Sequence, residues 1–209
     1  MTKKTWIDIS QPLHDGISHW PGDTPFKYET AFSKEQTGSV NIGRIITSLH
    51  TGTHVDAPFH FDNEGERILE LDIDVFIGPA RVIDVSYFEK VNAEMLRRFD
   101  LEGIERLLLK TSVPNNPDHF PERIQEIQPD IAAFLSEKGI KLLGVDVPSV
   151  DPLDSKDMAT HHALYRHGIQ ILENLMLDGI DDGVYELIAL PLALKDADGS
   201  PVRAVIRKL

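Results

Sequence analysis

The chain has 209 residues, and the 41% that are hydrophobic are enough to build the core of one compact domain. The formal net charge of −13 repels phosphate backbones and anionic lipids, which argues against nucleic-acid binding and against docking to a membrane surface. The absence of cysteine excludes disulfides, thiol nucleophiles and thiolate metal sites. No segment has the pattern of a membrane span or a signal peptide, so we expect a soluble, cytoplasmic protein.

The N-terminal part of the chain has the pattern of strands joined by turns. Alternating residues predict strands over 5–9 and 26–32, and the Ile- and Thr-rich stretch 42–55 predicts another. Glycine, proline and aspartate at 21–23 supply a turn between them. We therefore expect a β-rich layer at this end of the molecule.

The rest of the chain alternates between strand and helix patterns. Strands are expected over residues 80–85, 106–110, 140–147, 185–194 and 202–207, and helices over residues 92–98, 129–139 and 168–177. This alternation is typical of parallel α/β units. Because no repeat or flexible linker divides the sequence, we predict a single domain over residues 1–209, with a mixed α/β fold and an extra β layer.

The segment from His50 to His60 holds three of the nine histidines, beside an aspartate. On a strand, His50, Gly52, His54 and Asp56 would project from one face, and Gly52 would leave space between its neighbours. Two imidazoles and a carboxylate around a gap suit Zn²⁺, with Mn²⁺, Fe²⁺ or Co²⁺ as alternatives. A proline then ends the strand, so His60 is expected on the loop beyond, where it can serve a role other than ligation. The alternative is a polar strand face whose histidines only form hydrogen bonds.

A second group of candidate ligands comprises His161, His162 and Glu173. Adjacent residues point apart, so at most one of the two histidines is expected to join a given site. On a helix over residues 168–177, Glu173 would lie at the edge of the apolar stripe. Such a carboxylate is either a rim residue that reaches water or a buried ligand neutralised by a cation, and spacing alone favours the rim.

Three further features bear on function. Trp20 lies in a predicted loop, where it can stack on a planar substrate or cover the edge of the core. The stretch 144–151 ends a predicted strand with Asp146, Ser149 and Asp151, at a place where α/β sheets bind ligands. Neither a nucleophile elbow nor a glycine-rich phosphate loop is present, which argues against a serine hydrolase and against nucleotide chemistry.

With these residues in view, the sequence resembles the cyclase family of metal-dependent amide hydrolases. The resemblance rests on HTGTHVDAPFH at residues 50–60, and it extends from residues 6–10 to residues 199–203. Within that family the sequence is similar to the bacterial arylformamidases of tryptophan catabolism, on the basis of Trp-Pro-Gly-Asp at residues 20–23 and of overall length.

The resemblance implies a swivelling β/β/α fold, a homodimer and two metal ions per subunit, usually zinc. The metal ligands that it implies, position by position, are His50, His54, Asp56, His161 and Glu173. Asp56 and Glu173 would bridge the two ions, which replaces the rim interpretation of Glu173. The resemblance further implies that His60 is the general acid/base and that Trp20 contacts the substrate.

The reaction implied is hydrolysis of N-formyl-L-kynurenine to L-kynurenine and formate. A metal pair lowers the pKa of bound water and polarises the carbonyl, and His60 would protonate the leaving aniline nitrogen. Three alternatives stay open. The first is a related hydrolase of another amide, a lactone or a cyclic imide, and the second is a metal-dependent binding or sensor protein. The third is an iron oxygenase that uses His50, His54 and Asp56 and leaves His161 and Glu173 unused.

Overall fold

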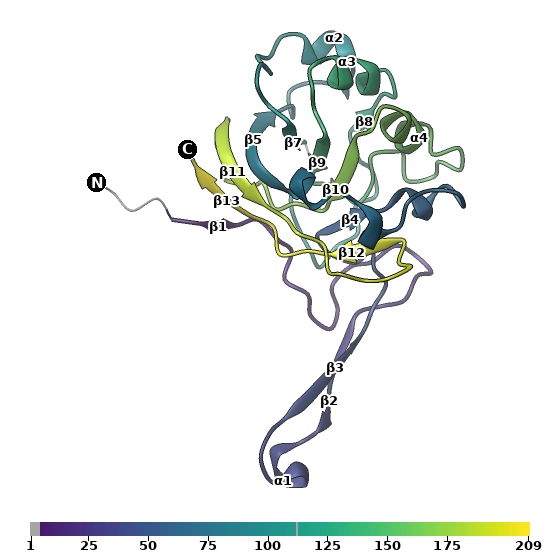
Figure 1. The fold of residues 1–209 in the computed structure, drawn as a ribbon, viewed down its shortest axis with the longest axis vertical. Coiled ribbons are helices and arrows are strands. Elements are labelled where there is room, and N and C mark those ends of the chain that lie inside the picture. Colours follow the sequence, from purple (N-terminus) through teal and green to yellow (C-terminus); the bar gives the residue numbers. More distant parts are fainter. Residues whose placement is uncertain (1–4, 112) are drawn as a thin grey trace.

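A curled sheet of nine strands runs through the protein in the order β1-β13-β11-β5-β7-β9-β10-β4-β12 (Figure 1). The computed structural model describes residues 5–111 and 113–209. The strands, in sheet order, are β1 (Ile7–Asp8), β13 (Val205–Lys208), β11 (Gly183–Ile188), β5 (Ile77–Asp84), β7 (Arg106–Lys110), β9 (Leu142–Val145), β10 (Gln170–Glu173), β4 (His54–Asp56) and β12 (Gly199–Pro201). The central strands β5, β7, β9 and β10 are parallel, and the strands that flank them pair antiparallel.

The central strands are buried on both faces, because each face packs against its own apolar cluster. Leu107 and Leu109 point into one cluster, whereas Leu108 between them points into the other. Helices α2 (Ala93–Leu96), α3 (Ile131–Glu137) and α4 (Ala159–Arg166) cover the first face (Figure 1). The outer strands curl around the second face, where Val55 and Ile206 are fully buried. The sheet therefore separates a helical layer from a β layer.

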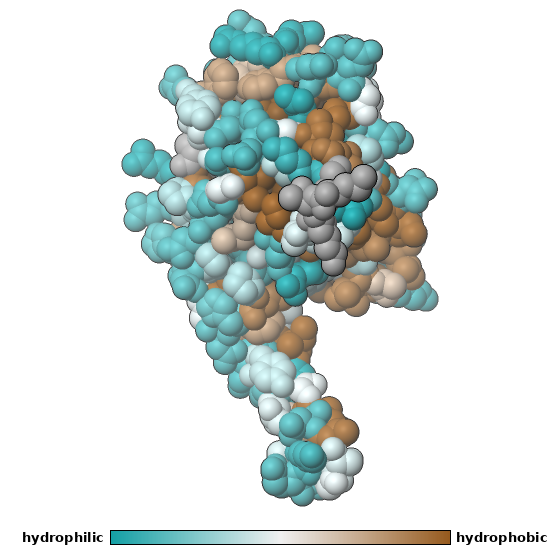
Figure 2. Space-filling view, turned by 90° about the vertical axis from the view of Figure 1, so that its left-hand side faces the viewer, coloured by the Kyte–Doolittle hydropathy of each residue, from teal (hydrophilic) through white to brown (hydrophobic). Residues whose placement is uncertain are grey.

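A hairpin arm projects from this body (Figure 1). The arm consists of β2 (Lys27–Phe32) and β3 (Ile42–Ile46), which pair antiparallel, with the short helix α1 (Lys34–Thr37) at its tip. Its large apolar side chains are about half exposed: Tyr28 53%, Phe32 55%, Val40 53%, Ile42 46%, Ile45 57% and Ile46 50%. Figure 2 shows apolar surface on the arm and on the adjoining part of the body.

Short elements complete the chain. They are the parallel pair β6 (Lys90–Val91) and β8 (Glu126–Ile127) and the 3₁₀ turns η1 (Pro58–His60), η2 (Ile68–Glu70) and η3 (Ile73–Phe76). Across residues 5–111 and 113–209, none of the helices has the length and apolarity needed to span a bilayer.

The predicted mixed α/β fold with an extra β layer is confirmed. The strand over 106–110 matches β7, and Asn92 caps α2 by accepting a hydrogen bond from the Met95 N–H at 2.9 Å. The strand expected over 26–32 corresponds to β2, and the helix expected over 129–139 contains α3.

The helix predicted over residues 168–177 is wrong. Gly168, with φ at 69°, follows the end of α4, and the chain then enters β10. Ile171 and Leu172 belong to opposite apolar clusters, so this segment must alternate its side chains between two faces, which a helix cannot do. The apolar spacing alone did not distinguish a one-sided helix from a strand buried on both sides.

The continuous strand predicted over 42–55 is also wrong. β3 ends at Ile46 and β4 begins at His54, and Gly52 between them has φ at 69°, a left-handed conformation that interrupts a strand. The strand predicted over 185–194 is shorter than expected and ends at Ile188. The region predicted as a strand over 202–207 starts its β13 ladder only at Val205.

Candidate metal site and cavity

The pairing of β4 with β10 brings the candidate ligands of two distant segments together. Glu173 lies opposite His54 in the antiparallel register, and Asp56 lies two residues further along β4, on the same face. Helix α4 covers this face of the sheet and supplies His161. These four side chains are 1–3% exposed, so the structure gathers two imidazoles and two carboxylates in the interior.

Nitrogen and oxygen atoms of these side chains approach one another closely. The Nε2 atom of His54 lies 3.2 Å from Asp56 Oδ1 and 3.5 Å from Glu173 Oε2. The Nε2 atom of His161 lies 3.5 Å from Asp56 Oδ2 and 3.7 Å from Glu173 Oε1. His50 joins from the turn before β4, with its Nδ1 atom 2.8 Å from Asp56 Oδ1. The Oδ1 atom of Asp56 thus faces His50 and His54, and its Oδ2 atom faces His161.

The histidines also use their second ring nitrogens, each with a different acceptor. These contacts join His50 Nε2 to Asp198 Oδ2 (3.1 Å), His54 Nδ1 to the Gly52 carbonyl oxygen (2.8 Å) and His161 Nδ1 to Asp151 Oδ2 (2.6 Å). A histidine that ligates a metal has this arrangement, in which one nitrogen donates to a fixed acceptor and the other presents its lone pair. The three rings are therefore oriented as a ligand set before any ion binds.

The donor atoms fall into two groups that share Asp56. One group is His50, His54 and Asp56, the other is Asp56, His161 and Glu173, and the ligand atoms within each lie within 4.8 Å of one another. Imidazole nitrogens and carboxylate oxygens in this number suit Zn²⁺ and similar divalent cations. The residues present therefore fit the binding of a divalent metal ion, with Asp56 common to both groups.

The electrostatics of the cluster point the same way. Burial, together with the nearby Asp56 charge, holds the pKa of Glu173 well above its usual range. Burial also disfavours the charged form of Asp56, but hydrogen bonds from the three histidines outweigh it and lower the pKa of Asp56. For His161, burial is outweighed by its hydrogen bonds to Asp151 and Asp56, so its pKa is raised to about 10. Two carboxylates that compete for positive charge in a buried site are an environment that favours a cation.

The row of ligands predicted on a single strand face is wrong for His50. Only His54 and Asp56 belong to β4, and His50 lies in the turn that precedes it. The Thr53 hydroxyl donates to the Asn174 carbonyl oxygen at 2.6 Å, and the Asn174 amide donates to the Gly52 carbonyl oxygen at 3.2 Å. These bonds anchor the turn to the end of β10. The turn, rather than a strand face, therefore places His50 beside the other candidate ligands.

The placement of Glu173 also differs from the rim interpretation. Glu173 lies on β10 rather than on a helix, it is 3% exposed, and its Oε1 accepts a hydrogen bond from the Val150 N–H at 3.0 Å. His161, not His162, faces the cluster, and the ring of His162 packs against Phe61 at 5.3 Å. Helix α4 therefore presents one histidine of the pair to the carboxylates, as the spacing argument required.

Sequence reasoning gave one functional candidate no specific role and missed another. Asp151 accepts from the backbone N–H groups of Thr160 and His161 as well as from the His161 ring, although the sequence drew attention only to its position after a strand. Asp198 contacts His50, and its Oδ2 lies 3.6 Å from Nδ1 of His60. Nothing in the sequence near residue 198 signals this contact, which depends on the pairing of β12 with β4.

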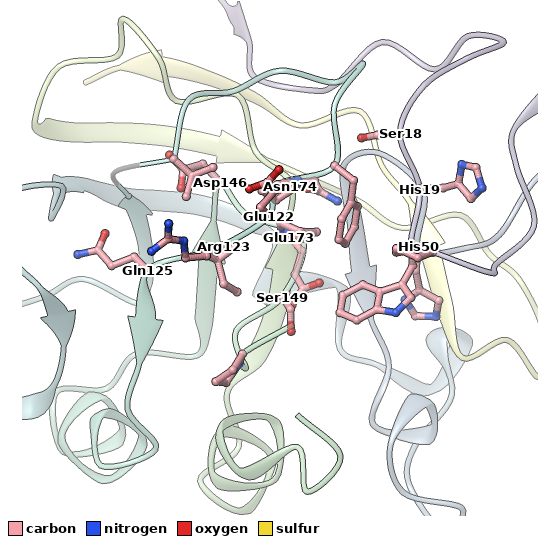
Figure 3. Close-up of a pocket in the computed structure, with 18 of the residues that line it drawn as sticks. Ser18, His19, His50, Glu122, Arg123, Gln125, Asp146, Ser149, Glu173 and Asn174 are labelled. Carbon is pink, nitrogen blue, oxygen red and sulfur yellow. The ribbon is translucent and has the colours of Figure 1, made fainter. Parts of the chain in front are cut away.

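A cavity of about 1240 Å³ opens over the cluster. Figure 3 shows Glu173 between His50 on one side and Asp146 on the other. His60, on the η1 turn, and Trp20 line the same cavity. Trp20 is 38% exposed and meets the ring of Phe120 edge-on, with centroids 5.4 Å apart. The cavity thus has a polar floor of candidate ligands and an aromatic wall.

Comparison with known proteins places this site in a family. A family model described as a putative cyclase matches residues 7–152. The chain belongs to the cyclase family. A kynurenine formamidase from Bacillus cereus is 63% identical to this chain over 209 residues, which is 100% of both chains. A Bacillus mycoides relative of the same name is also 63% identical over 100% of both chains.

Solved structures agree with this assignment of the chain to the cyclase family. A potential metal-dependent hydrolase with cyclase activity superimposes with a TM-score of 0.85, at 25% identity and with 99% of each chain covered. A predicted metal-dependent hydrolase from Bacillus stearothermophilus gives a TM-score of 0.82, at 26% identity and with the same coverage. The resemblance to the cyclase family that the sequence suggested is confirmed.

Proposed function

We propose that this chain is a kynurenine formamidase, which hydrolyses N-formyl-L-kynurenine to L-kynurenine and formate in tryptophan degradation. The observation that carries the proposal is the buried cluster of three oriented histidines and two carboxylates at the floor of the cavity. The choice of substrate is supported by relatives of that name at 63% identity over the full chain.

We propose that His50, His54, Asp56, His161 and Glu173 hold two zinc ions, with Mn²⁺ or another divalent metal as a possible substitute. Asp56 and Glu173 would contribute ligand atoms to both ions, since each carboxylate has histidine nitrogens close to both of its oxygens. A bound metal pair supplies an activated water and polarises the formyl carbonyl. The chain's own contribution is to fix the ligands, through Asp198, the Gly52 carbonyl and Asp151.

His60 is the proposed general acid/base. Its ring lies beside His50, with centroids 3.9 Å apart, and it lines the cavity, so it reaches a substrate bound over the cluster. It receives a proton from the attacking water and delivers one to the aniline nitrogen as the C–N bond breaks. Trp20 contacts the aryl ring, because it forms the aromatic wall of the cavity and keeps part of its surface exposed.

We further propose that the enzyme is a cytoplasmic homodimer of single-domain subunits. Both apolar clusters pack on the same sheet, which supports one domain. The exposed apolar side chains of the β2–β3 arm support a dimer, since an isolated two-stranded arm with an apolar surface is stabilised when another copy covers it.

The decisive test is hydrolysis of N-formyl-L-kynurenine by purified protein before and after chelation, with metal counted on the same sample. Turnover that is lost on chelation and restored by Zn²⁺, with about two ions per chain, is expected. Bound metal without turnover of this substrate would reject the formamidase assignment, and a panel of other amides, lactones and cyclic imides would then identify the related hydrolase. A chain that binds metal but hydrolyses none of these would be a binding or sensor protein.

A further inference from the structure

Asp198, the acceptor that orients the candidate ligand His50, has a second contact that the proposed chemistry does not account for. Its Oδ2 atom lies 3.1 Å from His50 Nε2 and 3.6 Å from His60 Nδ1, and the two rings lie side by side with centroids 3.9 Å apart and planes inclined by 33°. One carboxylate oxygen therefore faces a candidate metal ligand and the candidate acid/base at once. No partner for Nε2 of His60 is found in the described part of the chain, so this nitrogen is available to the cavity.

The backbone holds Asp198 at this position. The Ala57 N–H donates to the Asp198 carbonyl oxygen at 2.9 Å, and the next residue, Gly199, pairs with Asp56 in the β12–β4 ladder. A Cβ atom on Gly199 would lie 2.7 Å from Cε1 of His50, so a glycine is needed here for the ring to approach. Asp198 thus supplies the carboxylate that contacts the rings of His50 and His60, and Gly199 supplies the space that the His50 ring needs.

We propose that Asp198 is a positioning residue that acts through His60, holding the imidazole by its Nδ1 side so that Nε2 faces the substrate. A carboxylate that fixes the orientation and tautomer of a histidine is a recurrent device, and its loss costs about 10–100-fold in activity. The inference rests on the proposed role of His60, but it makes a claim about the orientation of this ring that can be measured without turnover.

The first test is a double-mutant cycle. Asp198→Ala and Asp198→Asn are expected to lower kcat for N-formyl-L-kynurenine by about 10–100-fold, with KM changed less than twofold. Both are measured at saturating Zn²⁺, because Asp198 also orients the ligand His50 and its loss weakens metal binding. In a His60→Ala background, Asp198→Ala is expected to have no further effect, because the residue through which it acts is gone. Asp196→Asn is the matched control, since Asp196 is an exposed acid two residues earlier whose φ of 63° asparagine tolerates.

Several results would overturn the proposal. An equal loss of kcat with and without His60 would show that Asp198 acts elsewhere. A loss of kcat in Asp198→Ala that saturating Zn²⁺ restores would make it a support of His50 alone. An unchanged kcat in Asp198→Ala would remove it from the mechanism. Wild-type protein without formamidase activity would instead reject the proposed function.

The second test uses metal-free protein and no substrate. Ring ¹⁵N shifts of His60 are expected to report a proton on Nδ1 in the wild type and in Asp196→Asn, and a mixture of tautomers in Asp198→Ala. A His60 tautomer that is the same in Asp198→Ala as in the wild type would contradict the positioning role, even if the variant is slow. A circular dichroism spectrum like that of the wild type would show that the variant is folded.

Discussion

The cluster of candidate metal ligands and the β2–β3 arm differ in how far the rest of the chain pairs or covers their side chains. In the cluster, every histidine has an acceptor for one nitrogen and carboxylates for the other, and four of its members are 1–3% exposed. Along the arm, apolar side chains stand 46–57% exposed with only a two-stranded hairpin behind them. The described part of the chain thus supplies every contact that orients the ligands, whereas it leaves the apolar side chains of the arm uncovered.

Removal of a bridging carboxylate is the strongest way to break the cluster. Glu173→Ala is expected to lose most of its bound metal and at least 1000-fold in turnover, because it removes a ligand that both ions would share. Metal content by mass spectrometry and kcat for N-formyl-L-kynurenine measure the two effects. Glu137→Gln, at an exposed glutamate that ends α3 and does not line the cavity, is the control. If Glu173→Ala bound as much metal as the wild type, Glu173 would not be a metal ligand.

The corresponding test for the arm targets its exposed apolar face. Phe32→Ser combined with Ile45→Asp is expected to weaken self-association at least 100-fold, since a charge and a polar group would be buried in the interface. Light scattering after size exclusion should give the mass of a dimer for the wild type and of a monomer for the double variant. Lys34→Gln at the exposed tip should leave the dimer intact. A monomeric wild type, or a dimeric double variant, would place the interface elsewhere.

Orientation of a ligand should matter less than its presence. Asp151→Asn leaves His161 in place but replaces the acceptor for its Nδ1 atom, so metal affinity is expected to fall about 10–100-fold while the fold is retained. Competition with a chelator of known affinity measures this change. Asp154→Asn, in the same loop, is the comparison variant. If Asp151→Asn bound metal as tightly as the wild type, the hydrogen bonds behind the ligands would be incidental to binding.

The cluster could be predicted in part because half of it is local. His50, His54 and Asp56 lie within seven residues, so spacing and chemistry identified them without a fold. Glu173 was assigned to the wrong element, since apolar residues spaced over 169–176 fit one face of a helix as well as a strand buried on both sides. Asp198 could not be predicted from the sequence, because its contact with His50 spans 148 positions and depends on the β12–β4 pairing.

For the arm, the sequence predicts a strand but not what its apolar face contacts. Its strand over 26–32 was predicted from alternation, but a sequence pattern does not tell whether the apolar face of a strand meets the protein's own core or another molecule. The alternation of Tyr28 and Phe32 resembles that of a half-buried strand, yet both side chains are more than 50% exposed. A local pattern thus specifies the element, and only the tertiary structure specifies what covers it.

The aromatic wall of the cavity lies between these two cases, since Trp20 is supported by Phe120 on one side and exposed on the other. Trp20→Ala is expected to raise KM for N-formyl-L-kynurenine by about 3–10-fold and to change kcat less than twofold. The reason is that an aromatic contact contributes about 0.5–1.5 kcal/mol, and a tenfold change in affinity corresponds to about 1.4 kcal/mol.

The chain offers a matched control in its other tryptophan. Trp6 is similarly exposed, at 37%, but packs against Arg207 at the β1 edge, so Trp6→Ala should leave KM unchanged. A fall in kcat with constant KM in Trp20→Ala would mean that the indole orients the reacting groups rather than holding the aryl ring, and an equal rise in KM in both variants would remove Trp20 from the binding surface.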